Sequence, residues 1–482
     1  MSDKPIILWF RQDLRLSDNP ALNRAAESGR PVLPVFVYDS QSPDVRSYGA
    51  AQKWWLNHSL NSLSQSLEKI RLPLLLLRAP AEDAIRNLIV ETGADAICWN
   101  RRYGKGEQAI DASIKAWAKE KSVDAKSFGG MLLHEPDVAR TQTGNPYKVY
   151  TPFWKKFSAN GPVRKPLSAP DAVKSFDAYP TGEKLEDWGL LPTRPDWAGD
   201  IAAEWTPGES GAEERLDQFL AENLCDYDTM RDHPGPDRTS KLSPHLRFGE
   251  VSPYQLWHAC HDQRRRADPK AREVWAKELV WREFSYHLLH HWPDLHESNF
   301  QEKFDAFPWK ENKNALSAWQ KGQTGYPIVD AGMRQLWQTG WMHNRVRMIV
   351  ASFLVKHLLI DWREGERWFW DTLVDGDPAA NPAQWQWVAG SGADAAPYFR
   401  IFNPMLQGEK FDKEGQYIRQ YVPELAEMPD KYIHTPWEAP GDVLKTADVV
   451  LGETYPHPIV DHQAARKRAL EALETTRPPA ED

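Results

Sequence analysis

The fold of the first part of the chain is decided by a short apolar run at residues 6–10, IILWF. Similar apolar runs recur at 32–37, 74–77 and 96–99. Continuous apolar runs of this length are typical of strands that are buried on both faces of a sheet. The polar stretches between them are long enough for a crossover helix each time. The pattern therefore predicts a parallel α/β sheet.

Three regions follow from composition and periodicity. Residues 1–134 form the predicted α/β domain, which we expect to be Rossmann-like in topology although no glycine-rich dinucleotide fingerprint follows its first strand. Residues 135–207 are rich in Pro, Gly, Ser and Asp and are predicted to be a long connector. Residues 208–482 show helical periodicity, as in 273–291 and 344–359, and are predicted to form an all-helical domain.

The bulk composition describes an ordinary globular protein, with 482 residues, 41% hydrophobic and 26% charged. No apolar run is long enough for a transmembrane helix, and the N-terminus lacks a signal peptide, so we expect a cytoplasmic protein. The three cysteines, Cys98, Cys225 and Cys260, are far apart and form no CxxC pair. We therefore expect neither a zinc site nor an iron–sulfur cluster.

The net charge of −9 does not suggest a nucleic-acid-binding protein, although local basic patches can still bind phosphate. Two candidate patches exist. One joins Arg264–Arg266 to Lys270, Arg272 and Lys277, and the other is Lys155–Lys156. For each patch, a solvated helix face is the simpler interpretation.

Tryptophan is unusually abundant, with 23 residues. A buried indole needs a hydrogen-bond partner for its N–H, and this many tryptophan rings are therefore costly to place in a protein interior. They can form a bulky core or a set of redox-active rings, and composition alone does not choose between these.

Hydroxyl-bearing residues precede a proline at Thr239, Ser240, Ser243 and Pro244, with Lys241 among them. Ser243 is predicted to cap a helix that starts at Pro244. Hydroxyls and free amides at a helix N-terminus also form a phosphate site. A plain helix cap remains the simpler alternative.

Two further groups have helical spacing. Glu278, Trp281 and Arg282 share one helical face and could meet a nucleobase, or they could form a salt-bridged helix with one buried tryptophan. A second face carries Asn344, Arg347 and Met348.

Two polar positions lie further along the helical part. The acidic turn Asp375–Asp377 offers carboxylates with which Arg347 could pair, in a site or in an interior ion pair. Asn381 precedes Pro382 and is predicted to be an N-cap with Pro382 at the first helical position, although its amide could instead serve a ligand.

Long stretches resemble the photolyase–cryptochrome family. The FAD-binding domain is matched at 324–387, TGYPIVDAGMRQLWQTGWMHNRVRMIVASFLVKHLLIDWREGERWFWDTLVDGDPAANPAQWQW. Further matches are 227–253, YDTMRDHPGPDRTSKLSPHLRFGEVSP, and 278–284, ELVWREF. Residues 8–22, LWFRQDLRLSDNPAL, resemble the opening motif of the family. The resemblance spans nearly the whole chain in the expected order and implies an α/β domain followed by a helical FAD-binding domain.

The resemblance implies FAD as cofactor and assigns residues to it. Those matching the positions that hold the phosphates and ribose are Tyr227, Thr239, Ser240, Lys241, Leu242 and Ser243. Those around the rings and the lesion cavity are Trp281, Arg282, Arg347, Asp375, Asp377 and Asn381, the last facing flavin N5. Lys241 stands where many members have Arg, which keeps a charge but loses the planar fork.

Substrate and electron-transfer positions follow in the same way. Positions that contact the flipped dimer or the DNA backbone are matched by Arg231, Glu278, Trp281, Asn344, Arg345, Met348, Trp387 and Gln407. The tryptophan relay of the family is matched by Trp309, Trp362 and Trp385. Four more rings, Trp337, Trp341, Trp368 and Trp370, raise the hypothesis of a second route.

Within the family, the residues favour repair of cyclobutane pyrimidine dimers. Members that repair (6-4) photoproducts have a histidine pair where this chain has His343–Asn344, and Asn381 stands where plant photoreceptors typically have Asp. The departure is Pro382–Gln384, where many dimer photolyases have Asn-Gly-Gly, and it suggests a bacterial subclass close to plant cryptochromes.

The expected function is therefore light-dependent dimer repair by electron transfer from excited, reduced FAD to a flipped-out dimer. A blue-light photoreceptor without repair activity is the main alternative, and a non-photochemical electron-transfer flavoprotein is the other. We expect damaged DNA as partner, a monomer, no membrane association, and a bacterial protein that acts at the nucleoid.

We also expect an antenna chromophore. Glu107, in 99-WNRRYGKGE-107, resembles a pterin-contacting carboxylate position and favours 5,10-methenyltetrahydrofolate, whereas a surface acid is the competing interpretation.

Overall fold

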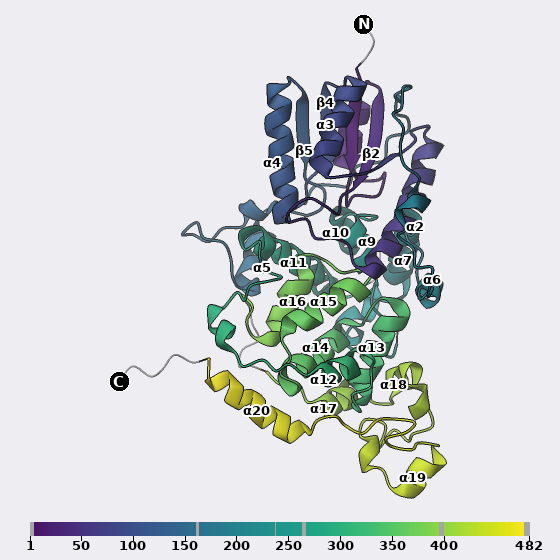
Figure 1. Ribbon diagram of the computed structural model, residues 1–482, viewed down its shortest axis with the longest axis vertical. Coiled ribbons are helices and arrows are strands. Elements are labelled where there is room, and N and C mark those ends of the chain that lie inside the picture. The colour runs from purple at the N-terminus through teal and green to yellow at the C-terminus, as the bar shows by residue number, and fades with distance from the viewer. Residues whose placement is uncertain (1–3, 161–162, 237, 263–266, 395–399, 477–482) are drawn as a thin grey trace. The chain divides into compact units, whose positions relative to one another are not determined.

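The computed structural model describes residues 4–160, 163–236, 238–262, 267–394 and 400–476. The chain forms two compact units, each containing segments far apart in sequence (Figure 1). The first unit comprises Met1–Asp226, Ser240–Pro293 and Val374–Pro378, and the second comprises Tyr227–Thr239, Asp294–Leu373 and Ala379–Asp482. The domain boundaries predicted from the sequence, at 134/135 and 207/208, are a different division and stay predictions.

The first unit contains a five-stranded parallel sheet in the order β3-β2-β1-β4-β5. The strands are β1 (Ile6–Phe10), β2 (Val32–Tyr38), β3 (Leu75–Arg78), β4 (Ala96–Asn100) and β5 (Asp124–Phe128). The first four confirm the apolar runs as strands of a parallel α/β sheet. The fifth was missed because β5 is an edge strand whose sequence, DAKSF, is polar and partly exposed.

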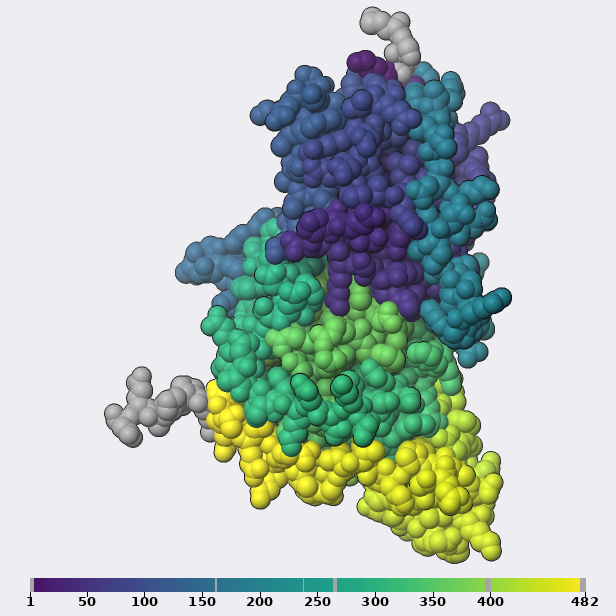
Figure 2. All heavy atoms as spheres, viewed as in Figure 1, coloured from purple at the N-terminus to yellow at the C-terminus, as the bar shows by residue number. Residues whose placement is uncertain are grey.

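Helices cover both faces of this sheet. They are α1 (Pro20–Glu27), α2 (Ala50–Lys69), α3 (Ala81–Thr92) and α4 (Lys105–Glu120). Alternate strand residues, such as Ile7 and Trp9, form one core with α3 and α4. Figure 1 shows α3 in front of the strands and α4 beside β5, and in Figure 2 the blue atoms of this part of the chain cover the same side. On the other face, the Cys98 thiol lies 3.4 Å from the carbonyl of Ala21 in α1.

The predicted connector contains more regular structure than its weak periodicity suggests. Its elements are η1 (Pro136–Val138), α5 (Tyr150–Ala159), η2 (Leu185–Trp188) and α6 (Gly199–Glu204). It is tied to the sheet, since the amide of Val32 donates to the carbonyl of Lys174 and the amide of Phe176 donates to the carbonyl of Val32. Long segments without much helix are held in place by such contacts.

The rest of the first unit is helical. It contains α7 (Glu209–Glu222), η3 (Leu224–Asp226), α9 (Ser243–Phe248), α10 (Pro253–His261) and α11 (Pro269–His291). The 23-residue helix α11 starts where Asp268 caps the amide of Lys270 and Pro269 occupies the first turn. It carries Glu278, Trp281 and Arg282, so the helix predicted at 273–291 is confirmed.

The second unit is helical throughout its named elements, as the sequence predicted. They are α8 (Tyr227–Met230), η4 (Glu302–Ala306), α12 (Lys313–Gln320), α13 (Pro327–Thr339), α14 (Asn344–Ser352), the π-helical η5 (Phe353–His357), α15 (Trp362–Thr372), α16 (Ala380–Ala389), α17 (Pro404–Phe411), α18 (Gln416–Tyr421), η6 (Pro423–Leu425), η7 (Pro436–Glu438), α19 (Gly441–Thr446) and α20 (His462–Glu474). Their core includes the buried rings of Trp319, Trp362 and Trp385. Among the described residues of the chain, no helix is both long and apolar enough to cross a membrane.

Candidate functional site

An acidic turn at residues 375–377 is held from three directions within the first unit. The Ser243 hydroxyl donates to Asp375 at 2.6 Å, Arg247 Nε donates to the carbonyl of the central glycine at 2.6 Å, and the Tyr286 hydroxyl donates to Asp377 at 2.7 Å. Burial, together with the neighbouring Asp377 charge, raises the pKa of Tyr286 well above its ordinary value. The phenol therefore stays a proton donor, and both carboxylates are fixed in orientation.

The role predicted for Ser243 as a helix cap is wrong. Leu242 occupies the N-cap position without a side-chain cap, and Ser243 is the first helical residue. Its hydroxyl donates to Asp375 at 2.6 Å instead.

The backbone before α9 has the shape of an anion site. Lys241 has a left-handed conformation with φ of 47°, and Leu242 is right-handed. Successive residues of opposite hand turn their amides toward one concave side, which favours an anion. The ammonium group of Lys241 lies 2.8 Å from the Glu204 carboxylate, so its charge is already partly balanced.

Helix α11 presents the three residues that the sequence placed on one face, and all are half-buried. Arg282 Nη1 donates to the carbonyl of Met131 at 2.7 Å, and its guanidinium lies 4.9 Å from the centre of the Tyr286 ring. Its Nη2 is buried and has no hydrogen-bond partner among the described residues. A buried donor without a partner is costly, so a ligand that accepts a hydrogen bond from this atom would be stabilised.

In the second unit, two arginines flank one acid. Arg345 donates to Asp232 at 2.7 Å, and Arg231 Nε lies 4.0 Å from the same carboxylate. The Arg345 guanidinium also lies 4.5 Å from the centre of the Phe411 ring. The cluster keeps a net positive charge and remains partly exposed, as a phosphate contact requires.

The face predicted on α14 is present. Asn344 is exposed at the start of the helix, whereas Arg347 and Met348 are half-buried one turn later. Arg347 Nε donates to the carbonyl of Met342 at 2.7 Å. The pairing predicted between Arg347 and the turn at 375–377 joins residues of different units and stays a prediction.

Asn381 is not the N-cap that the sequence predicted. Ala379 is the N-cap of α16, and both Asn381 and Pro382 lie within its first turn. A proline fits there because first-turn amides have no acceptor within the helix. The Asn381 amide donates to the backbone carbonyl and carboxylate of Glu366, at 3.0 and 2.8 Å, which fixes its orientation.

The relay rings differ in exposure. Trp385 and Trp362 are buried, whereas Trp309 is half-buried and contacts Phe307 at 4.3 Å between ring centres. Trp385 packs against Gly365, where a side chain would overlap its ring. Gly365 lies one turn after Trp362 on α15. The indole N–H of Trp362 donates to the side chain of Asn299 at 2.9 Å. These three rings therefore also contribute to the hydrophobic core of the second unit.

The extra tryptophans include one stacked pair. The rings of Trp337 and Trp368 are 6.2 Å apart and nearly parallel, at 8°. Trp337 is 57% exposed, whereas Trp368 packs against the core. Trp341 and Trp370 are buried.

The remaining substrate and FAD positions have the following burial. Tyr227 and Leu242 are buried, and Thr239, Ser240, Trp387 and Gln407 are half-buried. Thr239 Oγ1 is buried without a hydrogen-bond partner among the described residues. Gln407 lies on α17, next to the exposed Leu406.

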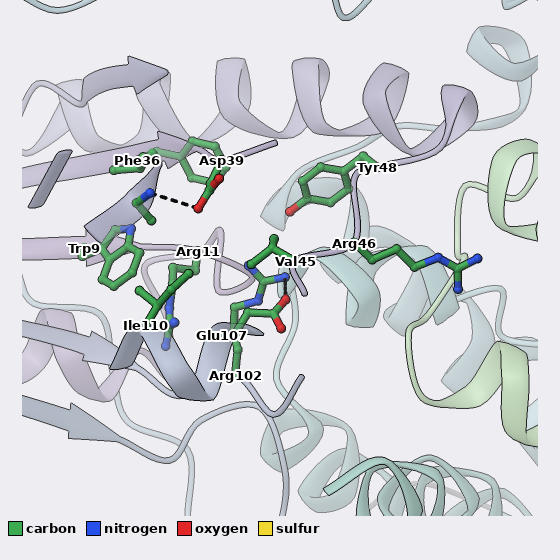
Figure 3. Close-up of a pocket in the computed structure, with 12 residues that line it drawn as sticks. Trp9, Arg11, Phe36, Asp39, Val45, Arg46, Tyr48, Arg102, Glu107 and Ile110 are labelled. Atoms are coloured by element: carbon green, nitrogen blue, oxygen red, sulfur yellow. Dashed lines mark hydrogen bonds and ion pairs between the residues drawn. The ribbon is translucent and has the colours of Figure 1, made fainter. Parts of the chain in front are cut away.

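A small pocket lies beyond the carboxyl ends of β1 and β2 (Figure 3). Trp9, Phe36 and Tyr48 form its apolar wall, and Glu107 pairs with Arg102 at 2.6 Å. Glu107 is therefore partly buried and ion-paired rather than a free surface acid. The pocket encloses about 30 Å³, which is room for two or three water molecules at roughly 10–15 Å³ each.

The basic patches receive little support. Arg272 is buried and donates to backbone carbonyls, among them that of Asp262 at 3.1 Å. Lys277 pairs with Glu273 on the same helix at 2.6 Å. Arg264–Arg266 lie outside the described residues.

Sequence reasoning missed Arg247, Tyr286 and Glu204. Arg247 lies one turn after Ser243, and Tyr286 one turn after Arg282, so helical spacing could have indicated both. Glu204 carries no such signal, because it comes from a separate short helix.

Known proteins resemble the chain along almost its whole length. Residues 6–171 match the family described as DNA photolyase, and residues 275–475 match the FAD binding domain of DNA photolyase. A deoxyribodipyrimidine photo-lyase of Agrobacterium fabrum is 55% identical, covering 97% of both chains. Cryptochrome-2 of Arabidopsis thaliana is 37% identical, covering 98% of this chain and 79% of that protein.

The fold is shared with solved structures. The crystal structure of a bacterial class III photolyase from Agrobacterium tumefaciens superposes with a TM-score of 0.96 at 54% identity, covering 99% of this chain and 98% of that one. The parallel sheet, the helical FAD-binding domain and the family expected from the sequence are thus confirmed. The chain belongs to the photolyase–cryptochrome family and is an enzyme of the photolyase type.

Proposed function

We propose that this chain repairs cyclobutane pyrimidine dimers in DNA, using light and bound FAD. The observation that carries the proposal is 55% identity, over 97% of both chains, to a protein named deoxyribodipyrimidine photo-lyase. The exposed Asn344 at the start of α14, with Met348 one turn later, agrees with dimer repair. We further propose that the protein acts as a monomer in the cytoplasm, and at the nucleoid because chromosomal DNA lies there.

The side chains present fit FAD. Two buried polar atoms, Arg282 Nη2 and Thr239 Oγ1, have no hydrogen-bond partner in the described part of the chain, and both belong to residues that match FAD positions. The opposite-handed pair Lys241–Leu242 would receive the phosphates, with Ser240 and Ser243 on either side of it in the sequence, and Tyr227 matches a further position of the same site. When bound and reduced, FAD would supply the electron on excitation, which is chemistry that the protein itself lacks.

Around the flavin ring, the chain would supply fixed polar groups. The hydroxyl of Ser243 and the phenol of Tyr286 hold the carboxylates of Asp375 and Asp377 in place. Glu366 holds the amide of Asn381, which would face flavin N5. Groups that are oriented before the ligand binds lose less entropy on binding.

The DNA contacts fall into two kinds. Arg231 and Arg345 would bind backbone phosphates, which gives affinity without sequence preference. Trp281 and Trp387 would stack on the extruded dimer, and Glu278, Asn344, Met348 and Gln407 would contact its edges. Extrusion of a target base is the documented strategy of photolyases, and it costs least for a damaged base that stacks poorly.

Trp309, Trp362 and Trp385 would carry an electron inward from the surface, since Trp309 is half-buried whereas Trp362 and Trp385 are both buried. The stacked pair Trp337 and Trp368 supports a second route, because its outer ring is exposed and its inner ring touches the core.

For the antenna we propose 5,10-methenyltetrahydrofolate. Glu107, which lines the pocket beyond β1 and β2 and pairs with Arg102, would contact the pterin. Chromophore release from denatured protein tests the identity, and unchanged folate content in a Glu107→Ala variant would exclude this pocket.

A blue-light photoreceptor is the second candidate, and the 37% identity to a plant cryptochrome supports it. Repair separates the two candidates. We expect wild-type protein to repair dimers under blue light, and Glu278→Ala to repair them about ten- to hundredfold more slowly, the effect of losing a hydrogen bond to a charged group. FAD content should be unchanged. Equal rates in both proteins would contradict the role of Glu278, and no repair in either would favour the photoreceptor.

A further inference from the structure

One face of Trp281 is covered by another aromatic ring. The ring of Tyr150, at the start of α5, lies 3.6 Å from that of Trp281, centre to centre, and only 5° from parallel. Phe284 meets Trp281 edge-on, at 5.9 Å and 74°. Tyr150 and Phe284 are buried, whereas Trp281 is half-exposed. Trp281 is therefore supported from one side and keeps accessible surface elsewhere.

Tyr150 is itself fixed to α11 at two points. Its hydroxyl donates to the carbonyl of Lys277 at 2.9 Å. In a regular α-helix that same carbonyl accepts the amide of the residue four positions later, which is Trp281. The Tyr150 ring also meets Phe284 edge-on, at 5.9 Å and 74°. Ring and hydroxyl together lock Tyr150 to the turn of α11 that carries Trp281.

We propose that Tyr150 is a positioning residue that holds the Trp281 ring in the orientation in which it stacks on the extruded dimer. This inference rests on the proposed function, which places Trp281 against the lesion. An extruded base on the face of Trp281 opposite Tyr150 would complete a stack of three rings, with Tyr150 as the innermost. Tyr150 comes from the predicted connector and matches none of the lesion or FAD positions derived from the sequence.

The physical effect is preorganisation. An indole on a half-exposed helix face has several rotamers, and freezing one on binding weakens affinity. Tyr150 freezes the rotamer beforehand, and parallel stacking at this distance adds attraction of its own. The benefit concerns only the damaged site, because undamaged DNA places no base on Trp281.

The experiment measures the affinity of FAD-loaded protein for matched oligonucleotides with and without one thymine dimer. We expect Tyr150→Leu to weaken binding of the dimer oligonucleotide about three- to tenfold, the effect of one side chain left mobile. Binding of the undamaged oligonucleotide should stay the same. Tyr150→Phe keeps the ring and loses only the hydroxyl, so it should restore most of the discrimination.

Phe157→Leu is the matched control. Phe157 is a buried aromatic residue on the same helix α5, where it contacts Phe153 and Trp257. It should cost as much thermal stability as Tyr150→Leu but leave dimer discrimination intact. Equal loss of discrimination in both variants would show general loosening of α5 and overturn the proposal.

A double-mutant cycle with Trp281→Ala separates the two claims. If Tyr150 acts through Trp281, Tyr150→Leu has no further effect on dimer affinity in the Trp281→Ala background. A full additional loss there would overturn the proposal. If Trp281→Ala alone leaves dimer affinity unchanged, the assigned role of Trp281 fails. If Trp281→Ala weakens dimer affinity but Tyr150→Leu does not, the role of Tyr150 is contradicted and that of Trp281 is supported.

Discussion

Glu283 is a buried carboxyl group on α11, next to Arg282. It accepts the amides of Leu133 and His134, at 2.9 and 3.3 Å, and so fastens the chain that follows the sheet to this helix. Burial raises the pKa of Glu283 from its ordinary value of 4.5 to about 7, although the Arg282 charge opposes the rise. The carboxyl group therefore titrates near neutral pH while holding a structural contact.

The pH dependence of stability follows from this shift. Because folding raises the pKa of Glu283, its contribution to the free energy of unfolding is largest below pH 4.5 and declines as the pH rises towards 7. A glutamine accepts the same two amides without a charge. In the wild type, this decline in the free energy of unfolding amounts to roughly 3 kcal/mol between pH 5 and 8. We expect Glu283→Gln to remove it, as measured by chemical denaturation. Glu273→Gln, on the exposed side of α11, is the control, and an unchanged decline in Glu283→Gln would contradict the assignment.

Ser243 shows how one hydroxyl can serve a ligand site through another residue. Its bond to Asp375 orients a carboxylate that is proposed to face the flavin. Removing a hydrogen bond to a charged group costs about 1.5–3 kcal/mol. We expect Ser243→Ala to weaken FAD retention by this amount, measured as the FAD-to-protein absorbance ratio during dialysis. Retention equal to that of the wild type would show that Asp375 is held without the hydroxyl.

The packing of α15 against α16 depends on Gly365. The Trp385 ring occupies the place where a side chain at this position would stand, so Gly365 lets the ring approach the helix that carries Trp362. We expect Gly365→Ala to displace Trp385, to destabilise the protein by about 1–3 kcal/mol, and to slow photoreduction of FAD. Gly441→Ala, at a helix start with open space around it, is the control. Normal photoreduction in Gly365→Ala would separate the position of Trp385 from electron transfer.

The stacked rings of Trp337 and Trp368 join α13 to α15. If they form a second route, photoreduction should persist at a reduced rate in Trp309→Phe and in Trp362→Phe, and disappear when Trp368→Phe is added. The measurement is the bleaching of oxidised FAD under blue light with an external reductant. Complete loss in either single variant argues against a branch.

Apolar runs and helical spacing predicted most of the elements, because burial on a sheet or helix face leaves a period in the sequence. The four central strands and α11 and α14 were predicted in this way, whereas the polar edge strand β5 was not. The caps at Ser243 and Asn381 were wrong because each helix already includes the residue predicted to cap it, and each side chain instead donates to a residue more than ten positions away, Asp375 and Glu366 respectively. Local sequence carries no sign of such partners, and the same is true of the Tyr150–Trp281 stack.

Across the whole molecule, the net charge of −9 argued against a DNA-binding protein, yet family membership outweighs it. A charge balance averages over the surface, whereas phosphate contacts depend on a few partly exposed arginines such as Arg231 and Arg345. FAD and light chemistry came from the resemblance and not from composition.

The most direct test of the account is repair itself. Reduced, FAD-loaded protein is mixed with an oligonucleotide that contains one cyclobutane thymine dimer, and thymine absorbance is followed under blue light and in darkness. We predict full recovery of thymine absorbance in the light and none in the dark. No recovery in the light, with a (6-4) photoproduct repaired instead or neither lesion repaired, would contradict the central claim.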